Sequence, residues 1–429
     1  MPNPPFDPVA LITQAYAAAR AEPPRSWHEQ GLMAGFPPAP EARVKRSNFM
    51  RAPYNRWGFQ HIDRLLPTIT VRAPRAAHPL EIRSTHALDA FTLRSLSGAQ
   101  VPLAEHLAAT CTDGFLVLAN GSVVHEHYAN GHGPEQRHIM FSVTKSLIGT
   151  LGQAAVHDGR LDDTKLAGDY VPELRGSAFG DATVRHLLDM AVGIDYREDY
   201  ADATSESSQF GYACGLTPGP LAEGDPLPPE YAGLDSLYTF LPRLRKRGGH
   251  GGFFHYVTAT TEALAWVIER ATGEACHVQL ERLWQALGCE RDGFFIADPL
   301  GRNVAGAGYS ATLRDIARFG QMLLDRGQVD GRQVLPRAVI DTLLAGGSVE
   351  EFARNEDFAP FHGLSYKSQW YVRNGEALVA LGVHGQMLVV DFAARVVIVK
   401  QSSTPEAIDL LGIDTWLAVQ QIAAHLAHG

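Results

Sequence analysis

The sequence predicts an α+β fold in which one antiparallel sheet, flanked by helices, is joined by a second and mostly helical lobe. Strand-like segments occur early, from Gly114 onward, and again late, over residues 376–401. Stretches with helical periodicity lie between these two groups and at the C-terminus. Because strands come from both ends of the chain, we expect them to build one sheet that packs against the intervening helices.

The composition is that of a globular protein and excludes several classes of partner. Hydrophobic residues make up 45% and charged residues 20% of the 429 residues, which argues against disorder and coiled coils. The net charge of −10 opposes binding to nucleic acid or to an anionic membrane. The sequence lacks a membrane-spanning run and a signal-peptide pattern. We therefore expect a cytoplasmic protein whose four cysteines, widely spread and without metal-ligand spacing, are reduced thiols.

The first elements follow from turn signals and periodicity. Residues 1–99 are rich in Pro and Arg, and we expect an N-terminal extension wrapped on the main body. From Gly114, two apolar segments flank Asn120-Gly121, a dipeptide that favours a type I′ hairpin turn. A helix is predicted from Ser142 until Asp158-Gly159 ends it. Residues 100–429 are expected to form the main domain, with the helical lobe inserted at about 160–300.

Later elements complete the prediction. A helix over Thr260–Ala271 places its apolar residues on one face, and Gly273 ends it. Another helix is predicted over residues 311–327, and an amphipathic helix over residues 413–428. Strands are predicted in the runs EALVALGVHG, QMLVVDF and RVVIVKQ.

The strongest chemical motif is S-x-x-K at Ser142 and Lys145, at the start of the first predicted helix. Residues three apart on a helix share one face, so the amine of Lys145 can reach the hydroxyl of Ser142. A serine hydroxyl is a poor nucleophile until a base takes its proton, and a desolvated lysine can be that base. The structural alternative is that Ser142 only caps the helix.

Several blocks in the same order resemble the serine β-lactamase-like, or penicillin-recognising, family. The segment FSVTKSLIGTLGQAAVHDGRLDDTKLAGDYVPEL resembles the nucleophile helix of class C β-lactamases, their esterase relatives and DD-peptidases. The blocks TVRHLLDMAVGI, GGFFHYVTATTEALAWVIERATG and GYSATLRDIARFGQMLLDRG follow in family order. The resemblance implies the β-lactamase/transpeptidase-like fold and a serine hydrolase without metal or organic cofactor.

The resemblance also assigns roles to the second motif. Tyr256 matches the tyrosine of Y-x-N, whose phenol shares the proton of the serine and passes it to the leaving group. Thr258 stands where the family has asparagine, and it is carried over as a substrate-binding position. A phenol with its ordinary pKa of about 10 is a weak base at neutral pH, so this role needs the lysine charge beside it.

The third family motif, K-T-G, is replaced here by residues 383–386, which hold no lysine. That lysine helps to hold the substrate carboxylate in β-lactamases and peptidases, so its loss argues against β-lactams as substrates. Gly385 would let substrate approach the strand closely. The resemblance implies an oxyanion hole formed by the backbone N–H groups of Ser142 and Gln386. His384 either orients the substrate or packs in the protein interior.

Within the family, the chain is most similar to the 6-aminohexanoate-dimer hydrolases and related esterases. The HGQ and FHY forms of the motifs and the segment APYNRWGFQHIDRLLPT carry this resemblance. It implies that Tyr200 reaches the scissile amide, although a loop tyrosine is more often a surface residue. Trp370 is a candidate aromatic wall for the substrate, with core packing as the alternative.

Other features carry less chemistry. His125 and His127 share one strand face, but no third ligand accompanies them, and no metal site is predicted. The run GGHGG lacks the Lys-Ser/Thr of a phosphate loop and predicts a turn.

We therefore predict a serine amidase or esterase with an acyl-enzyme on Ser142 and a small-molecule substrate. A homodimer is compatible with the sequence, which leaves the oligomeric state open. One alternative is a β-lactamase or DD-peptidase. An alternative of another class is a catalytically silent binding protein on the same fold.

Overall fold

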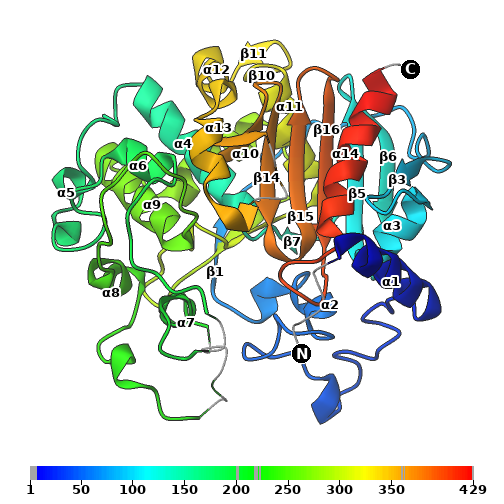
Figure 1. Ribbon diagram of the computed structural model, residues 1–429, viewed down its shortest axis with the longest axis horizontal. Coiled ribbons are helices and arrows are strands. Elements are labelled where there is room, and N and C mark those ends of the chain that lie inside the picture. The colour runs from blue at the N-terminus through cyan, green and yellow to red at the C-terminus, as the bar shows by residue number, and fades with distance from the viewer. Residues whose placement is uncertain are drawn as a thin grey trace.

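The computed structural model describes residues 7–199, 202–216, 221, 224–358, 361 and 363–427. A central sheet of eight strands has helices on both faces, and a helical region lies to one side (Figure 1). The predicted α+β architecture is confirmed. In spatial order the strands of this sheet are β12 (Leu364–Lys367), β13 (Trp370–Arg373), β14 (Ala377–Gly382), β15 (Gln386–Asp391), β16 (Val396–Ser402), β5 (Thr112–Ala119), β6 (Ser122–Tyr128) and β2 (Glu81–Ile82).

The sheet joins the two ends of the chain along β16 and β5, which pair antiparallel from Val396 opposite Ala119 to Ser402 opposite Thr112. The hairpin between β5 and β6 turns at Asn120 and Gly121, whose φ angles are 51° and 87°. Two consecutive positive φ angles are what a type I′ turn requires, so the predicted hairpin is confirmed. Pairing is antiparallel throughout this sheet except between β2 and β6.

Alternate residues of the central strands face two different hydrophobic layers. Leu116 and Leu118 of β5 belong to the larger core, whereas Phe115 and Val117 belong to the layer beneath the C-terminal helix. Since both faces are covered, the strands read as nearly continuous apolar runs rather than as alternating ones.

The four helices predicted from periodicity are present. They are α4 (Val143–His157), α9 (Thr258–Thr272), α11 (Leu313–Leu324) and α14 (Gly412–Ala427). α11 packs on β15, β16 and β5, and α14 lies across β16 and β3 (Thr92–Arg94) on the other face (Figure 1). α4 runs between the sheet and α9, so it is buried on all sides and places its first turn in the interior.

A second, four-stranded sheet lies beside the nucleophile helix. Its strands, in spatial order, are β1 (Thr68–Val71), β8 (Gly293–Ile296), β9 (Tyr309–Ala311) and β7 (His138–Ile139). Two further pairs of short strands are β3 with β4 (Gln100–Pro102) and β10 (Gln328–Val329) with β11 (Arg332–Gln333). β1 and β2 lie within residues 1–99 and pair with strands of the main body. The boundary at residue 99 stays a prediction.

The region between α4 and β8 consists of helices and loops in the part of the chain that is described. Its helices are α5 (Ala167–Tyr170), η3 (Pro172–Leu174), α6 (Val184–Leu188), α7 (Glu206–Ala213), η4 (Pro229–Tyr231), α8 (Leu237–Phe240), η5 (Leu241–Arg243), α9 and α10 (Cys276–Ala286). The remaining helices are α1 (Pro8–Ala21), η1 (Pro40–Ala42), α2 (Asn55–Gly58), η2 (Ile62–Arg64), α3 (Leu103–Ala109), α12 (Arg337–Ala345), α13 (Val349–Ala353), η6 (Glu356–Phe358) and η7 (Val383–Gly385). Over the described residues, no helix combines the length and apolar character that crossing a membrane requires.

The segment around α2 is anchored to the central sheet by a buried ion pair. Arg56 Nη1 donates to Asp113 Oδ1 of β5 at 2.9 Å, to Cys111 O at 3.1 Å and to Ser403 Oγ at 2.8 Å. Asp113 also accepts from His138 Nε2 at 3.1 Å and from Ser403 Oγ at 2.6 Å. Burial alone raises the pKa of Asp113, but these partners together lower it, so its carboxylate is charged.

We predict that Arg56→Met lowers the free energy of unfolding by about 3–5 kcal/mol, because it leaves the Asp113 charge buried without its cation. Urea denaturation followed by circular dichroism measures the change. The matched control is Arg270→Met, which breaks an ion pair with Glu173 whose side chains are each 46% exposed. The control is expected to lose less than about 1 kcal/mol. Equal losses in the two variants would contradict the role of the buried pair.

Candidate active site

Ser142 and Lys145 lie at the buried start of α4. Ser142 directly precedes the helix, and Phe141 before it has φ 43°, a left-handed conformation that is uncommon outside glycine. The Ser142 side chain makes no capping hydrogen bond to the helix. Its hydroxyl instead accepts a hydrogen bond from Lys145 Nζ at 2.9 Å. The capping alternative is therefore not what the structure shows.

The amine of Lys145 is enclosed by protein. Lys145 is 1% exposed, and besides Ser142 its Nζ donates to the carbonyl of Gly306 at 2.7 Å. Burial disfavours the charged amine and lowers its pKa to about 7, although the carboxylates of Glu198 and Glu262 act in the opposite direction. A lysine with this pKa exchanges its proton near neutral pH, which is what a base for a serine hydroxyl requires.

The Gly306 carbonyl is held in place by Glu262 of α9. Glu262 is fully buried and accepts the backbone N–H groups of Gly306 at 2.8 Å and of Ala305 at 3.1 Å. Burial raises the pKa of Glu262, whereas Arg302, these two amides and Lys145 lower it. Gly306 has no room for a side chain, because a Cβ atom would lie 2.6 Å from Cγ2 of Thr258. Thr258, which replaces the family asparagine, thus packs against the turn whose carbonyl binds the lysine.

Tyr256 completes the cluster from the loop before α9. Its hydroxyl hydrogen-bonds the Ser142 side chain and the hydroxyl of Tyr371, and its ring centroid lies 5.0 Å from Lys145 Nζ. Burial raises the pKa of Tyr256 above its ordinary value, so the neutral phenol is favoured. The structure brings Ser142, Lys145 and Tyr256 together, as the sequence predicted, and adds Tyr371 beside them.

The residues that replace K-T-G form a tight turn between β14 and β15. His384 and Gly385 have φ angles of 59° and 85°, and Gln386 begins β15 opposite Gly382. The Gln386 side chain points inward, where its Nε2 donates to Ser402 O at 2.7 Å. The backbone N–H of Gln386 faces the carbonyl of Gly382 across the β14–β15 pair, so the expected role of this N–H in an oxyanion hole is not what the structure shows.

Two expected substrate contacts are interior residues. His384 is 4% exposed, packs against Phe59 and Phe141, and donates through Nδ1 to Thr404 O at 2.8 Å, which is the packing alternative. Trp370 is fully buried and donates through Nε1 to Thr150 Oγ1 at 3.0 Å.

The interpretation of Trp370 as a substrate wall is therefore wrong. Successive residues of a strand face opposite sides, so Trp370 faces α4 while Tyr371 faces Tyr256. Tyr200, the other expected substrate contact, lies outside the described residues.

No cluster of three or more metal-ligating side chains occurs among the residues that the structure describes. The histidine His125 lies 3.7 Å from the carboxylate of Asp89, and His86 lies 3.1 Å from the same group. GGHGG forms a turn, in which His250 contacts Asp181 at 2.9 Å. The active-site residues are a serine, a lysine and tyrosines, which suit acyl transfer rather than metal binding.

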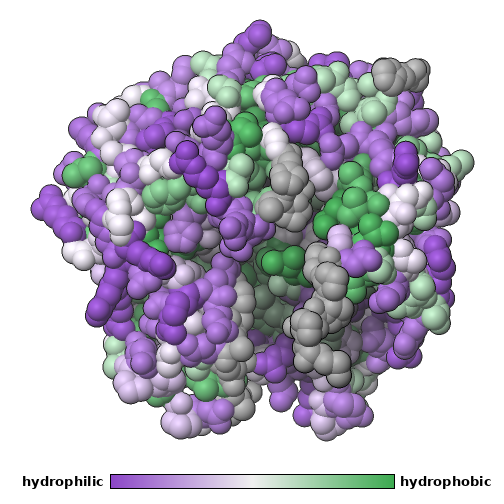
Figure 2. All heavy atoms as spheres, in the orientation of Figure 1, coloured by the Kyte–Doolittle hydropathy of each residue, from purple (hydrophilic) through white to green (hydrophobic). Residues whose placement is uncertain are grey.

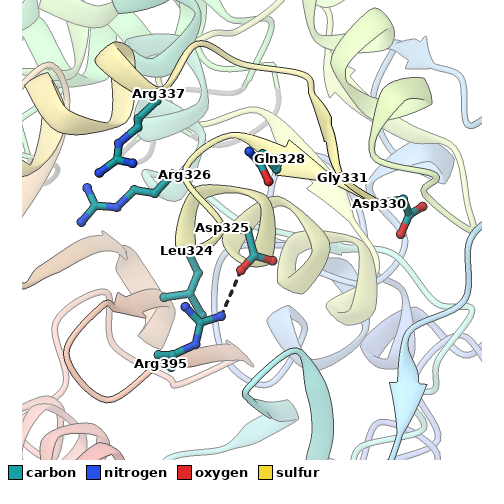
Figure 3. Close-up of a pocket in the computed structure, with 8 residues that line it drawn as sticks. All are labelled: Leu324, Asp325, Arg326, Gln328, Asp330, Gly331, Arg337 and Arg395. Carbon is teal, nitrogen blue, oxygen red and sulfur yellow. Dashed lines mark hydrogen bonds and ion pairs between the residues drawn. The ribbon is translucent and has the colours of Figure 1, made fainter.

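A surface hollow of about 380 Å³ lies away from these residues, next to α11 and the β10–β11 hairpin. Figure 3 shows Arg395 directed at Asp325, to which it pairs at 3.1 Å. Arg326 pairs with Asp341 at 2.8 Å. Since these charges are already paired, the hollow is a poor anion site. Figure 2 shows a different hollow near the middle of its face, with hydrophobic residues around it.

Sequence reasoning missed Glu262, Gly306 and Tyr371. A lone acid within the small and apolar stretch TATTEALAWV is a signal for a buried carboxylate. Gly306 and Tyr371 carry no local signal, because they reach the site only through the packing of distant segments.

The chain resembles known hydrolases over most of its length. Residues 104–421 match the sequence family described as beta-lactamase. The 6-aminohexanoate-dimer hydrolase of Paenarthrobacter ureafaciens is 37% identical over 376 residues, which span 87% of this chain and 91% of that protein.

Solved structures agree with this match. A Bacillus anthracis protein assigned as a 6-aminohexanoate-dimer hydrolase has a TM-score of 0.80 and 30% identity, over 91% of this chain and 99% of that one. A penicillin-binding protein homologue from Caulobacter crescentus shares the fold, with a TM-score of 0.54 and 18% identity over 73% of this chain and 92% of that one. The predicted resemblance is confirmed: the chain belongs to the beta-lactamase family and is a serine hydrolase.

Proposed function

We propose that the chain hydrolyses an amide or ester bond of a small substrate through an acyl-enzyme on Ser142. The observation that carries this proposal is the 2.9 Å contact between the buried Lys145 amine and the Ser142 hydroxyl. In its neutral form the amine can take the hydroxyl proton as Ser142 Oγ bonds to the substrate carbonyl carbon. Tyr256, which hydrogen-bonds the same hydroxyl, then passes a proton to the leaving nitrogen or oxygen as its bond to the carbonyl carbon breaks.

The second half of the reaction reverses these proton transfers. A proton first passes from Lys145 to Tyr256, so that both groups regain their starting forms. Water then attacks the acyl carbon as Lys145 takes one of its protons, and Tyr256 gives its proton to Ser142 Oγ as the bond from Oγ to the acyl carbon breaks and the acid product departs. The proton on Lys145 returns to Tyr256. The backbone N–H of Ser142 is the proposed donor to the oxyanion of both tetrahedral intermediates, and one such donor is worth about 3–4 kcal/mol in acyl-transfer enzymes. Thr258, Gly385 and Tyr200 are the proposed neighbours of the substrate.

The substrate class is supported by the relatives. Two proteins similar over most of the chain are named for the amide 6-aminohexanoate dimer. A β-lactamase or DD-peptidase is the weaker candidate, because residues 383–386 supply no lysine for a substrate carboxylate. We also propose a cytoplasmic location, since all four cysteines are buried and unpaired, as is usual in a reducing compartment.

The nucleophile assignment predicts labelling by a fluorophosphonate probe. The wild type is expected to bind one probe per chain, because the activated hydroxyl attacks phosphorus, and Ser142→Ala is expected to bind none. Intact-mass spectrometry counts the adducts. Ser348→Ala removes a helix cap that is not part of the Ser142, Lys145 and Tyr256 cluster, and as the control it is expected to keep full labelling. Labelling of Ser142→Ala to the wild-type extent would exclude Ser142 as the nucleophile.

Acylation of Ser142 by a substrate without turnover would favour the alternative of a catalytically silent binding protein.

The pH profile of kcat/KM is expected to show an acid limb near pH 7, with activity rising as Lys145 loses its proton. Glu262→Gln removes a negative charge that favours the ammonium, so the limb should move to lower pH by roughly one unit. Glu198→Gln should move it in the same direction at low salt, but the shift should vanish at 1 M salt because Glu198 is exposed. An acid limb unchanged in Glu262→Gln would contradict this electrostatic role.

A substrate panel separates the remaining alternatives. We expect turnover of 6-aminohexanoate dimer and of p-nitrophenyl butyrate. The kcat/KM for nitrocefin is expected to be at least about 100-fold lower than for these two substrates, because the site lacks the carboxylate-binding lysine. Absorbance and amine-release assays measure the three rates, with Ser142→Ala as the blank. Preferred turnover of nitrocefin would establish the β-lactamase alternative.

A further inference from the structure

The tip of the hairpin between β12 and β13 is buried against three helices of the site. The hairpin turns at Ser368 and Gln369, because Lys367 pairs with Trp370 across it. The two turn residues have φ angles of 46° and 66°, and they are 0% and 1% exposed. Two consecutive positive φ angles fit a type I′ turn, in which glycine and asparagine are the usual residues. A glutamine in this conformation costs free energy, so its side chain calls for a physical account.

The backbone of the turn is fixed to the nucleophile helix. Ser146 Oγ, one residue after Lys145, donates to the carbonyl of Gln369 at 2.7 Å. Gly149, further along α4, has no room for a side chain, because a Cβ atom would lie 2.1 Å from the Ser368 carbonyl oxygen. The hairpin tip therefore lies directly against α4, in a defined position relative to Lys145.

The Gln369 side chain extends this attachment to two further helices. Its Nε2 donates to the carbonyls of Leu187 at 2.8 Å and Leu188 at 3.0 Å, which end α6. The last carbonyls of a helix lack partners within it, so these bonds help to cap α6. The Gln369 Oε1 accepts from Thr261 Oγ1 of α9 at 2.8 Å, and Thr261 is fully buried. The side-chain amide thus donates to one helix and accepts from another.

These contacts join the two helices that surround the Lys145 amine. On α4, the residue after Lys145 binds the Gln369 backbone. On α9, Thr261 binds the Gln369 side chain and directly precedes Glu262. Glu262 accepts the Gly306 amide, and the carbonyl of Gly306 is the second acceptor of Lys145. A shift of α9 relative to α4 would therefore change the hydrogen bonds of the Lys145 amine.

We propose that Gln369 is a positioning residue, whose side chain holds α9 against the hairpin tip while its backbone holds the tip against α4. The proposal rests on the acyl-enzyme mechanism proposed above, because it concerns the geometry of Lys145 and of Tyr256, which lies in the loop before α9. Gln369 acts through the helices that it contacts and not through the substrate. A displacement of about 1 Å in reacting groups can cost on the order of 100-fold in rate.

The test is Gln369→Gly, which suits the positive φ and keeps the backbone bonds of the turn but removes the bridge to α6 and α9. We expect kcat and the rate of fluorophosphonate labelling to fall together by about 10- to 100-fold, with KM within about twofold. The final labelling should still reach one adduct, on Ser142. The matched control is Asn374→Gly, which introduces glycine at a φ of 52° in the exposed turn at the other end of β13. It should label at the wild-type rate.

A milder variant covers the case in which Gln369→Gly does not fold. Thr261→Val keeps the branched shape of the side chain but removes the hydroxyl that donates to Gln369 Oε1. We expect it to lower kcat by roughly 3- to 10-fold, whereas Thr261→Ser keeps a hydroxyl and should retain most of the wild-type rate. In the double variant, Thr261→Val should add less than about twofold to the loss in Gln369→Gly, because both changes break the same hydrogen bond.

The outcomes separate the two proposals. Absence of labelling at Ser142 in the wild type would overturn the acyl-enzyme mechanism itself. If the wild type is labelled, a folded Gln369→Gly that labels equally fast would overturn only the positioning role. Losses that multiply in the double variant, or equal losses in Thr261→Ser and Thr261→Val, would also contradict this role, because the bond between the hydroxyl and the amide would then not carry the effect.

Discussion

The arrangement of the site depends on the Lys145 amine, which is held between the Ser142 hydroxyl and the Gly306 carbonyl with almost no exposure to solvent. In water this amine would be a permanent cation and could not take a proton from serine. Burial lowers its pKa to about 7, and the two oxygen acceptors provide the hydrogen bonds that the amine loses with its hydration shell. The surrounding structure keeps this environment dry and fixes both acceptors.

Buried charges in this protein act on backbone groups as well as on one another. Glu262 accepts the amides of the turn that presents the Gly306 carbonyl, and Lys400 donates to the carbonyl of Gly385. Each charge binds the backbone of a turn next to the proposed catalytic residues. A fixed buried charge can hold such a peptide without reorganising as the reaction proceeds.

The N-terminal segment forms part of the floor of the site. Phe59 packs edge-to-face on Phe141, which precedes Ser142, and on His384, which lies in the turn between β14 and β15. Arg56 ties the same segment to Asp113 in the central sheet. A single short segment thus contacts both halves of the proposed catalytic machinery, so its attachment to the sheet also governs their relative positions.

Much of the fold follows from local signals. The Asn120-Gly121 turn, the helix after Ser142 and the late strands each have turn residues or periodicity that fix them within a few residues. Trp370 and His384 show what such signals do not predict. Both are next to the site in sequence, yet the strand alternation turns Trp370 into the core, and Phe59, from over 300 residues away, covers His384. Nothing in the residues around either position states which face will be covered.

The sequence by itself determined the family, the α+β architecture and the three side chains that meet at the site, because these depend on motif spacing and on periodicity within short segments. Only the tertiary structure decided which groups surround them. Gly306, Glu262 and Tyr371 reach the site from separate elements, and their roles arise from burial and from the hydrogen bonds that they make there. Both are properties of packing between distant segments, which the local sequence does not predict.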